Sequence, residues 1–119
     1  MKERIVRSES PLNLESPFED LDAFITRNER FYLRTHFPIP KIDKREWRLS
    51  ILGEVVKAFE ISFEELSKLE TKTLPVTLEC AGNNRSFLEP KVKGVQWELG
   101  AVGTANWTGV PLSILLDRA

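Results

Sequence analysis

The sequence is poor in the residues that most often hold metals. It has one cysteine, Cys80, and one histidine, His36, among 119 residues. A single cysteine excludes an intrachain disulfide, and the two side chains are too few for a structural zinc or iron–sulfur site. Any metal held by this chain therefore needs most of its ligands from a cofactor or from a second chain.

The chain also lacks an excess of positive or negative charge and any long apolar run. The net charge is -1, so no basic surface for nucleic acid is expected. No window approaches the ~18 apolar residues of a membrane span, and the charged N-terminus lacks the apolar stretch of a secretory signal. We expect no nucleic-acid partner and no membrane span. The expected location is cytoplasmic by default, and periplasmic if a leader has been removed.

The length and the 41% hydrophobic content suit one domain with one core. Residues 1–17, with Ser, Pro and Glu but little periodicity, are predicted to be an extended, poorly packed N-terminal arm. Residues 18–119 are predicted to form the domain. Its first elements would be a short helix over 18–25, a turn at 28–30, and an extended segment over 31–37 that Pro38 and Pro40 end.

The rest of the chain alternates short strands with short helices. Strands are predicted over 47–53, 59–61 and 74–80, where apolar and β-branched residues alternate with polar ones. Ser62 and Glu65 form a capping box that begins a helix reaching about Leu69. Residues 92–108 are expected to be compact loops with short strands, and Pro111 to open a helix over 111–118. This content indicates an α+β protein.

Cys80 stands where an apolar strand meets a polar loop. A free cysteine is often a small packed side chain, and a nucleophilic thiol would need His36 as its base. The loop residues favour a third interpretation. Gly82 lets the backbone approach a ligand closely, and the amides of Asn83 and Asn84 and the guanidinium of Arg85 suit an anionic, sulfur-ligated metal centre.

Four segments resemble the molybdopterin-binding domain of the sulfite oxidase family. They are the cysteine loop Leu78–Ser86, the aromatic-x-Arg-x-His-x-Pro-x-Pro segment Phe31–Pro40, the strand Trp47–Gly53, and the glycine-rich stretches 92–97 and 100–110. The resemblance covers roughly residues 18–118, with the segments in the family's order. It implies a sulfite-oxidase-type fold of mixed short strands with peripheral helices. The family domain continues past the last residue of this chain, so the chain resembles a truncated, N-terminal part of it.

The resemblance also implies a site. Cys80 would be the protein's ligand to the metal of a Mo-molybdopterin cofactor, and Cys80, Arg34 and Arg85 would be the catalytic residues, the two arginines binding the anion. Arg34, together with Tyr32, Thr35, His36 and Cys80, would contact the cofactor. Trp97 and Trp107 are expected to be core and loop anchors, because tryptophan carries a large apolar area.

The function that the resemblance implies is oxygen-atom transfer, with oxidation of a small oxyanion, sulfite, to sulfate. A separate cytochrome or other electron carrier would be the partner. Two departures weaken the case for sulfite: Asn84 stands where animal-type sulfite oxidases have Arg, and Thr35 where they have Asn. Reduction of nitrate or sulfoxides and a truncated, cofactor-free binding module are the alternatives. Truncation also predicts exposed apolar surface and association, with a homo-oligomer as one outcome.

Overall fold

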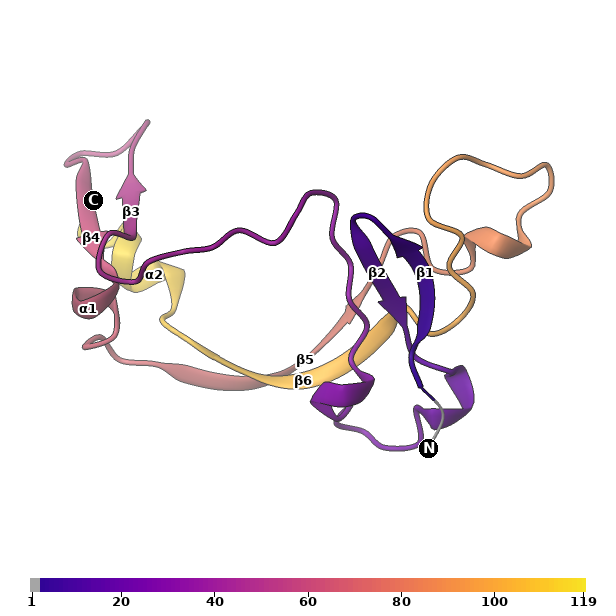
Figure 1. The fold of residues 1–119 in the computed structure, drawn as a ribbon. Helices are drawn as coiled ribbons and strands as arrows, with labels where there is room; N and C mark the ends of the chain where they lie inside the picture. Colours follow the sequence, from indigo (N-terminus) through magenta and orange to yellow (C-terminus); the bar gives the residue numbers. More distant parts are fainter. Residues whose placement is uncertain (1–2) are drawn as a thin grey trace. The chain divides into compact units, whose positions relative to one another are not determined.

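The computed structural model describes residues 3–119 (Figure 1). Its contacts divide the chain into two compact units. The first unit holds the described residues up to Ile39 together with Pro75–Asn106, and the second holds Pro40–Leu74 with Trp107–Ala119. Within residues 3–119, no helix has the length and apolar content needed to cross a membrane.

An antiparallel hairpin opens the first unit. Its strands are β1 (Ile5–Glu9) and β2 (Leu12–Glu15), with a bulge between Val6 and Ser8. The poorly packed arm predicted for residues 1–17 is therefore wrong over the described residues. Its polar composition misled the prediction, since β2 turns its polar residues inward: Asn13 and Glu15 are each only 1% exposed.

Glu15 ties the hairpin to a loop more than eighty positions further along the chain. Its carboxylate accepts from the Arg7 Nε at 2.6 Å, from the Glu98 backbone N–H at 3.0 Å and from the Gly100 N–H at 2.9 Å. Burial by itself lowers the pKa of Arg7, but hydrogen bonds and charge from Glu15 and Glu98 raise it overall. These partners offset the cost of burying the carboxylate, which an unpaired buried carboxylate would not recover.

The segment after the hairpin is less helical than the sequence suggested. The predicted helix over 18–25 is one 3-10 turn, Phe18–Asp20. The chain then extends, because Thr26 is hydrogen-bonded to Thr104. The Thr26 N–H donates to the Thr104 carbonyl at 2.8 Å, and the Thr104 N–H donates to the Thr26 hydroxyl at 3.1 Å. The turn at 28–30 is confirmed as a 3-10 turn, Asn28–Arg30. Beyond it, the extended segment over 31–37 is confirmed, and Leu33 bridges to Leu14 of β2.

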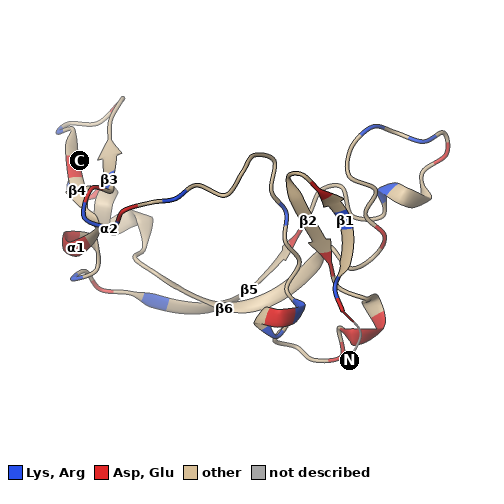
Figure 2. Cartoon of the chain, in the orientation of Figure 1, with Lys and Arg blue, Asp and Glu red and all other residues tan. Residues whose placement is uncertain are grey.

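Two long strands, β5 (Lys72–Glu79) and β6 (Val102–Gly109), pair with each other. β5 agrees with the predicted strand over 74–80, but β6 is longer than the short strands expected there. Figure 2 shows charged residues only at the two ends of β5 and none in β6. All residues of β5 and the last four of β6 are exposed, which agrees with the predicted exposed apolar surface: Leu74 is 59% and Leu78 40% exposed.

The second unit contains the other paired strands and both α-helices. β3 (Arg48–Ile51) and β4 (Phe59–Ser62) agree with the strands predicted over 47–53 and 59–61, and they pair antiparallel. The capping box is also confirmed, since Ser62 and Glu65 exchange hydrogen bonds at the start of α1 (Phe63–Leu66), although the helix ends before Leu69. Pro111 precedes α2 (Leu112–Leu116). Ile61 and Leu115 are the buried apolar residues of this unit.

Trp97 and Trp107 have different surroundings. Trp97 is completely buried, so its predicted role as a core anchor is confirmed. Trp107 is 49% exposed and lies in β6, not in a loop, so it is not the second core or loop anchor that was predicted.

We expect Glu15→Ala to destabilise the protein strongly, because two loop N–H groups lose their acceptor and Arg7 keeps only Glu98 as its ion-pair partner. Breaking a buried ion pair in this way costs about 3–5 kcal/mol. Urea unfolding of the variant measures the loss. Glu64→Ala is the matched control, since its ion pair with Lys68 is exposed and its removal should leave the midpoint unchanged. An unfolding midpoint for Glu15→Ala equal to that of the wild type would contradict the role given to Glu15.

A second prediction concerns the close approach of Gly100 to the hairpin. A Cβ atom on Gly100 would lie 1.7 Å from the backbone oxygen of Ser16, whereas one on Gly109 would meet nothing within 4 Å. Gly100→Ala should therefore prevent the loop from docking and lower the melting temperature sharply. Gly109→Ala should be neutral or slightly stabilising. Equal melting temperatures for the two variants would show that the loop moves aside at no cost.

Candidate functional site

Cys80 directly follows the last residue of β5. Its backbone N–H donates to the Ala101 carbonyl at 2.9 Å, and its own carbonyl accepts from the Asn83 N–H at 2.8 Å. The thiol is half-buried and forms no disulfide. The strand and the turn after it thus hold the Cys80 backbone on both sides, and the sulfur remains partly open.

The loop after Cys80 is fastened largely by Asn83. The Asn83 amide donates to the Glu79 carboxylate at 2.9 Å, and its oxygen accepts from the Ala101 N–H at 3.1 Å. The sequence suggested this amide as a group facing a ligand, but the structure commits it to the loop itself. The Gly82 N–H donates to the Cys80 Sγ, 3.4 Å away.

Arg85 passes between two glycines of the same loop. A Cβ atom on Gly82 would lie 2.6 Å, and one on Gly94 2.5 Å, from the nearest atom of the Arg85 guanidinium. Its Nη1 donates to the Val95 carbonyl at 2.9 Å. A side chain at either glycine would displace the guanidinium from this place, and Gly94 in addition has φ +122°, which favours glycine.

Asn84 has the left-handed backbone conformation, with φ 69°. Asparagine tolerates that region better than most residues. Its N–H donates to the Glu98 carbonyl at 2.7 Å, and its side chain is exposed. Asn84, which stands where the animal-type pattern has Arg, is thus compatible with the turn that it occupies.

Tyr32 interacts electrostatically with Cys80. Its ring stacks on Phe31 with centroids 5.4 Å apart and meets the edge of Trp97 at 6.5 Å. Burial raises the pKa of Tyr32, and the negative charges of Cys80 and Glu79 raise it further. The phenol is therefore close enough to the sulfur to sense its charge.

Arg34, Thr35 and His36 form a second cluster. The Arg34 Nη2 lies 3.4 Å from the His36 Nδ1, and its Nη1 donates to the Thr35 carbonyl. Arg34 and His36 are exposed. Thr35 is held to the hairpin, because its hydroxyl donates to the Leu12 carbonyl at 2.7 Å. An exposed guanidinium with a neighbouring imidazole is suited to bind an anion.

The predicted residues are thus gathered in the first unit as two groups. Tyr32 joins Cys80, and Arg34 joins Thr35 and His36; within residues 3–119 no hydrogen bond or ion pair joins Arg34 to Cys80. Sequence reasoning missed Asn13 and Glu15, which hold these groups in place. The polar residues at positions 13 and 15 alternate with apolar ones, and this pattern was the available signal of a strand. It would normally indicate that the polar face of the strand is exposed.

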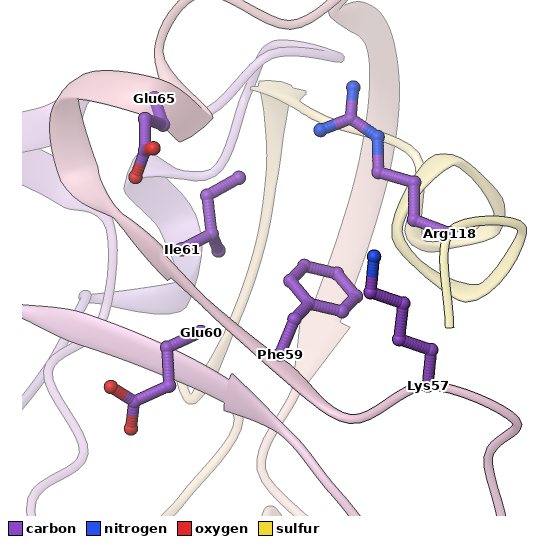
Figure 3. Close-up of a pocket in the computed structure, with 6 residues that line it drawn as sticks. All are labelled: Lys57, Phe59, Glu60, Ile61, Glu65 and Arg118. Atoms are coloured by element: carbon purple, nitrogen blue, oxygen red, sulfur yellow. The ribbon is translucent and has the colours of Figure 1, made fainter.

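The described residues provide no metal site of their own. Among residues 3–119, no three His, Cys, Asp or Glu side chains gather as metal ligands. The second unit contains a pocket of about 490 Å³ lined by Lys57, Phe59, Glu60, Ile61, Glu65 and Arg118 (Figure 3). That pocket contains none of the predicted site residues.

Comparisons with known proteins agree on the family. Residues 36–119 match the family described as oxidoreductase molybdopterin binding domain. Mitochondrial sulfite oxidase of Mus musculus is 37% identical over 118 residues, covering 96% of this chain and 22% of that protein. A nitrate reductase [NADPH] of Leptosphaeria maculans is 38% identical over 117 residues, covering 92% and 13%.

A solved structure is also similar. The sulfane dehydrogenase SoxCD of Paracoccus pantotrophus aligns with a TM-score of 0.78 and 29% identity, over 94% of this chain and 29% of that one. The chain thus spans about a fifth of the length of the sulfite oxidases that it matches. The family match covers more than half of the chain, and the cysteine loop lies within it. The chain belongs to the molybdopterin-binding oxidoreductases of the sulfite oxidase family.

Proposed function

We propose that this chain provides the molybdenum-ligating cysteine and part of the anion pocket of an oxidoreductase that transfers an oxygen atom, with oxidation of sulfite to sulfate as the first candidate. The observation that supports this best is the setting of Cys80. A half-buried thiol follows a strand, a loop N–H donates to its sulfur, and the phenol of Tyr32 interacts electrostatically with it.

The donor set fits a Mo-molybdopterin centre. The chain offers one thiolate and, among residues 3–119, no cluster that could hold a metal alone. A soft thiolate is suited to a metal that already carries sulfur ligands. When bound, the cofactor supplies the remaining sulfur ligands and the two-electron redox chemistry. Cys80 would hold the metal, while Tyr32, Arg34, Thr35 and His36 would contact the cofactor.

The arginines would bind and orient the substrate. Arg34 is exposed and keeps N–H donors for an oxyanion beside His36. Arg85 donates to Val95 through Nη1, and a guanidinium has five N–H donors, so further donors remain for an anion. Positive charge held in place before the anion arrives stabilises the charge that shifts during oxygen transfer.

The overall reaction balances as sulfite plus water giving sulfate, two protons and two electrons. The oxygen atom gained by sulfur comes from water, and the electrons leave to a separate cytochrome or other electron carrier. The role of the protein is to hold the oxyanion against the metal centre and to keep its charge compensated.

Nitrate reduction is the second candidate. The identity to the nitrate reductase of Leptosphaeria maculans, 38%, equals or exceeds that to the sulfite oxidases. In addition, Asn84 brings no charge to the loop where the animal-type pattern has Arg. A pocket with one cation fewer suits a monoanion such as nitrate better than the dianion sulfite.

Metal analysis of the full-length gene product tests the cofactor. Expressed in a host that makes the cofactor, the wild type should carry stoichiometric molybdenum and pterin. Cys80→Ser should lower the molybdenum content strongly, because a hydroxyl is a poorer ligand for this centre. Ala81→Ser is the matched control, since it adds the same hydroxyl one residue away and keeps the thiol. A full-length wild type without molybdenum would overturn the proposal in favour of a cofactor-free module. Turnover with sulfite, nitrate and sulfoxides then separates the candidate reactions.

The proximity of Tyr32 to Cys80 can be measured without the cofactor. Tyr32 is the only tyrosine, so the phenolate absorbance of the apoprotein reports its pKa alone. Cys80→Ala removes one of the charges that raise this pKa, and the titration midpoint should therefore fall. It should stay above the ordinary value, because burial is the larger cause. Glu54→Gln, at an exposed position in the second unit, should leave the midpoint unchanged. An unchanged midpoint in Cys80→Ala would show that the phenol does not lie near the sulfur.

A further inference from the structure

Asn13 of the hairpin contacts the segment that carries the anion-binding arginine. The side chain is 1% exposed. Its Oδ1 accepts from the Thr35 backbone N–H at 3.0 Å and from the Arg34 Nη1 at 3.4 Å. Its Nδ2 donates to the Pro11 carbonyl at 2.9 Å, which orients the amide so that the oxygen faces Arg34.

The same segment is held to β2 on both sides of this contact. Leu14 and Leu33 exchange backbone hydrogen bonds of 2.9 and 2.8 Å. The Thr35 hydroxyl donates to the Leu12 carbonyl at 2.7 Å. The backbone on either side of Arg34 is thus fixed by the hairpin, and Asn13 Oδ1 is the acceptor that also reaches the guanidinium.

We propose that Asn13 is a positioning residue for Arg34, and that its neutral amide is what the anion site requires. This inference rests on the proposed function, in which Arg34 binds an oxyanion. An amide oxygen fixes the guanidinium by a hydrogen bond and leaves its positive charge uncompensated. An aspartate in the same place would still accept from the guanidinium but would offset the charge that attracts the anion.

The alternative is that Asn13 only closes the hairpin turn through Pro11. Ser8 provides the matched control, because its hydroxyl donates to the same Pro11 carbonyl at 2.9 Å and makes no contact with Arg34. Ser8→Ala removes a turn contact alone. Asn13→Asp keeps the Oδ1 acceptor, loses the donor to Pro11 and adds a negative charge beside Arg34.

The experiment uses the cofactor-loaded, full-length gene product. Sulfate affinity is measured by calorimetry at constant ionic strength, and KM and kcat are measured with sulfite. We expect Asn13→Ala to weaken sulfate binding about tenfold and to raise KM more than it lowers kcat, since an ionic hydrogen bond that orients Arg34 is lost. Asn13→Asp should weaken sulfate binding at least as much, because its negative charge offsets that of Arg34. Ser8→Ala should bind sulfate as the wild type does.

A double-mutant cycle with Arg34→Ala separates the possible causes. If Asn13 acts through Arg34, Asn13→Ala should have no further effect on sulfate affinity once Arg34 is removed. Wild-type affinity in Asn13→Asp, or an additive effect in the double variant, would overturn the inference. If Arg34→Ala weakens binding and the Asn13 variants do not, only the inference about Asn13 fails. If Arg34→Ala itself leaves the affinity unchanged, the anion-binding role in the proposed function fails with it.

Discussion

The buried carboxylate of Glu15 is the interaction on which the first unit depends. It is 1% exposed and is satisfied by Arg7 from its own hairpin and by backbone N–H groups of Glu98 and Gly100. Such a group is stable only when all of these partners are present together. The hairpin and the loop before β6 therefore order each other, and Gly100 is required because the backbone of Ser16 passes against it.

The loop that Glu15 orders also contacts the cysteine. Gly100 is followed by Ala101, whose carbonyl accepts from the Cys80 N–H and whose own N–H donates to Asn83. Glu15 thus acts on the thiol through backbone contacts. On the same face of β2, two residues earlier, Asn13 acts on Arg34 and Thr35. Since alternate residues of a strand share a face, one strand holds both parts of the proposed site.

Local signals predicted several elements correctly. The capping box at Ser62, the strand leading to Cys80 and the turn at 28–30 depend on neighbouring residues, and each lies where the sequence indicated. The helix over 18–25 fails because a distant partner, Thr104, holds Thr26 in an extended chain. The hairpin was missed because buried polar residues in a strand alternate in the same way as exposed ones. Only their hydrogen-bond partners distinguish the two cases.

The sequence by itself determined the family and the candidate ligand. The residues of the cysteine loop carry the resemblance, and the family match over residues 36–119 confirms it. It also determined that one thiol cannot hold a metal alone, because the ligand count follows from composition. Tertiary structure decided what holds that thiol and the arginine: Glu15 and Asn13, whose partners lie from 21 to 85 positions away in the chain or within the hairpin. Hydrogen bonds over such separations depend on the folded backbone, and no local pattern of residues encodes them.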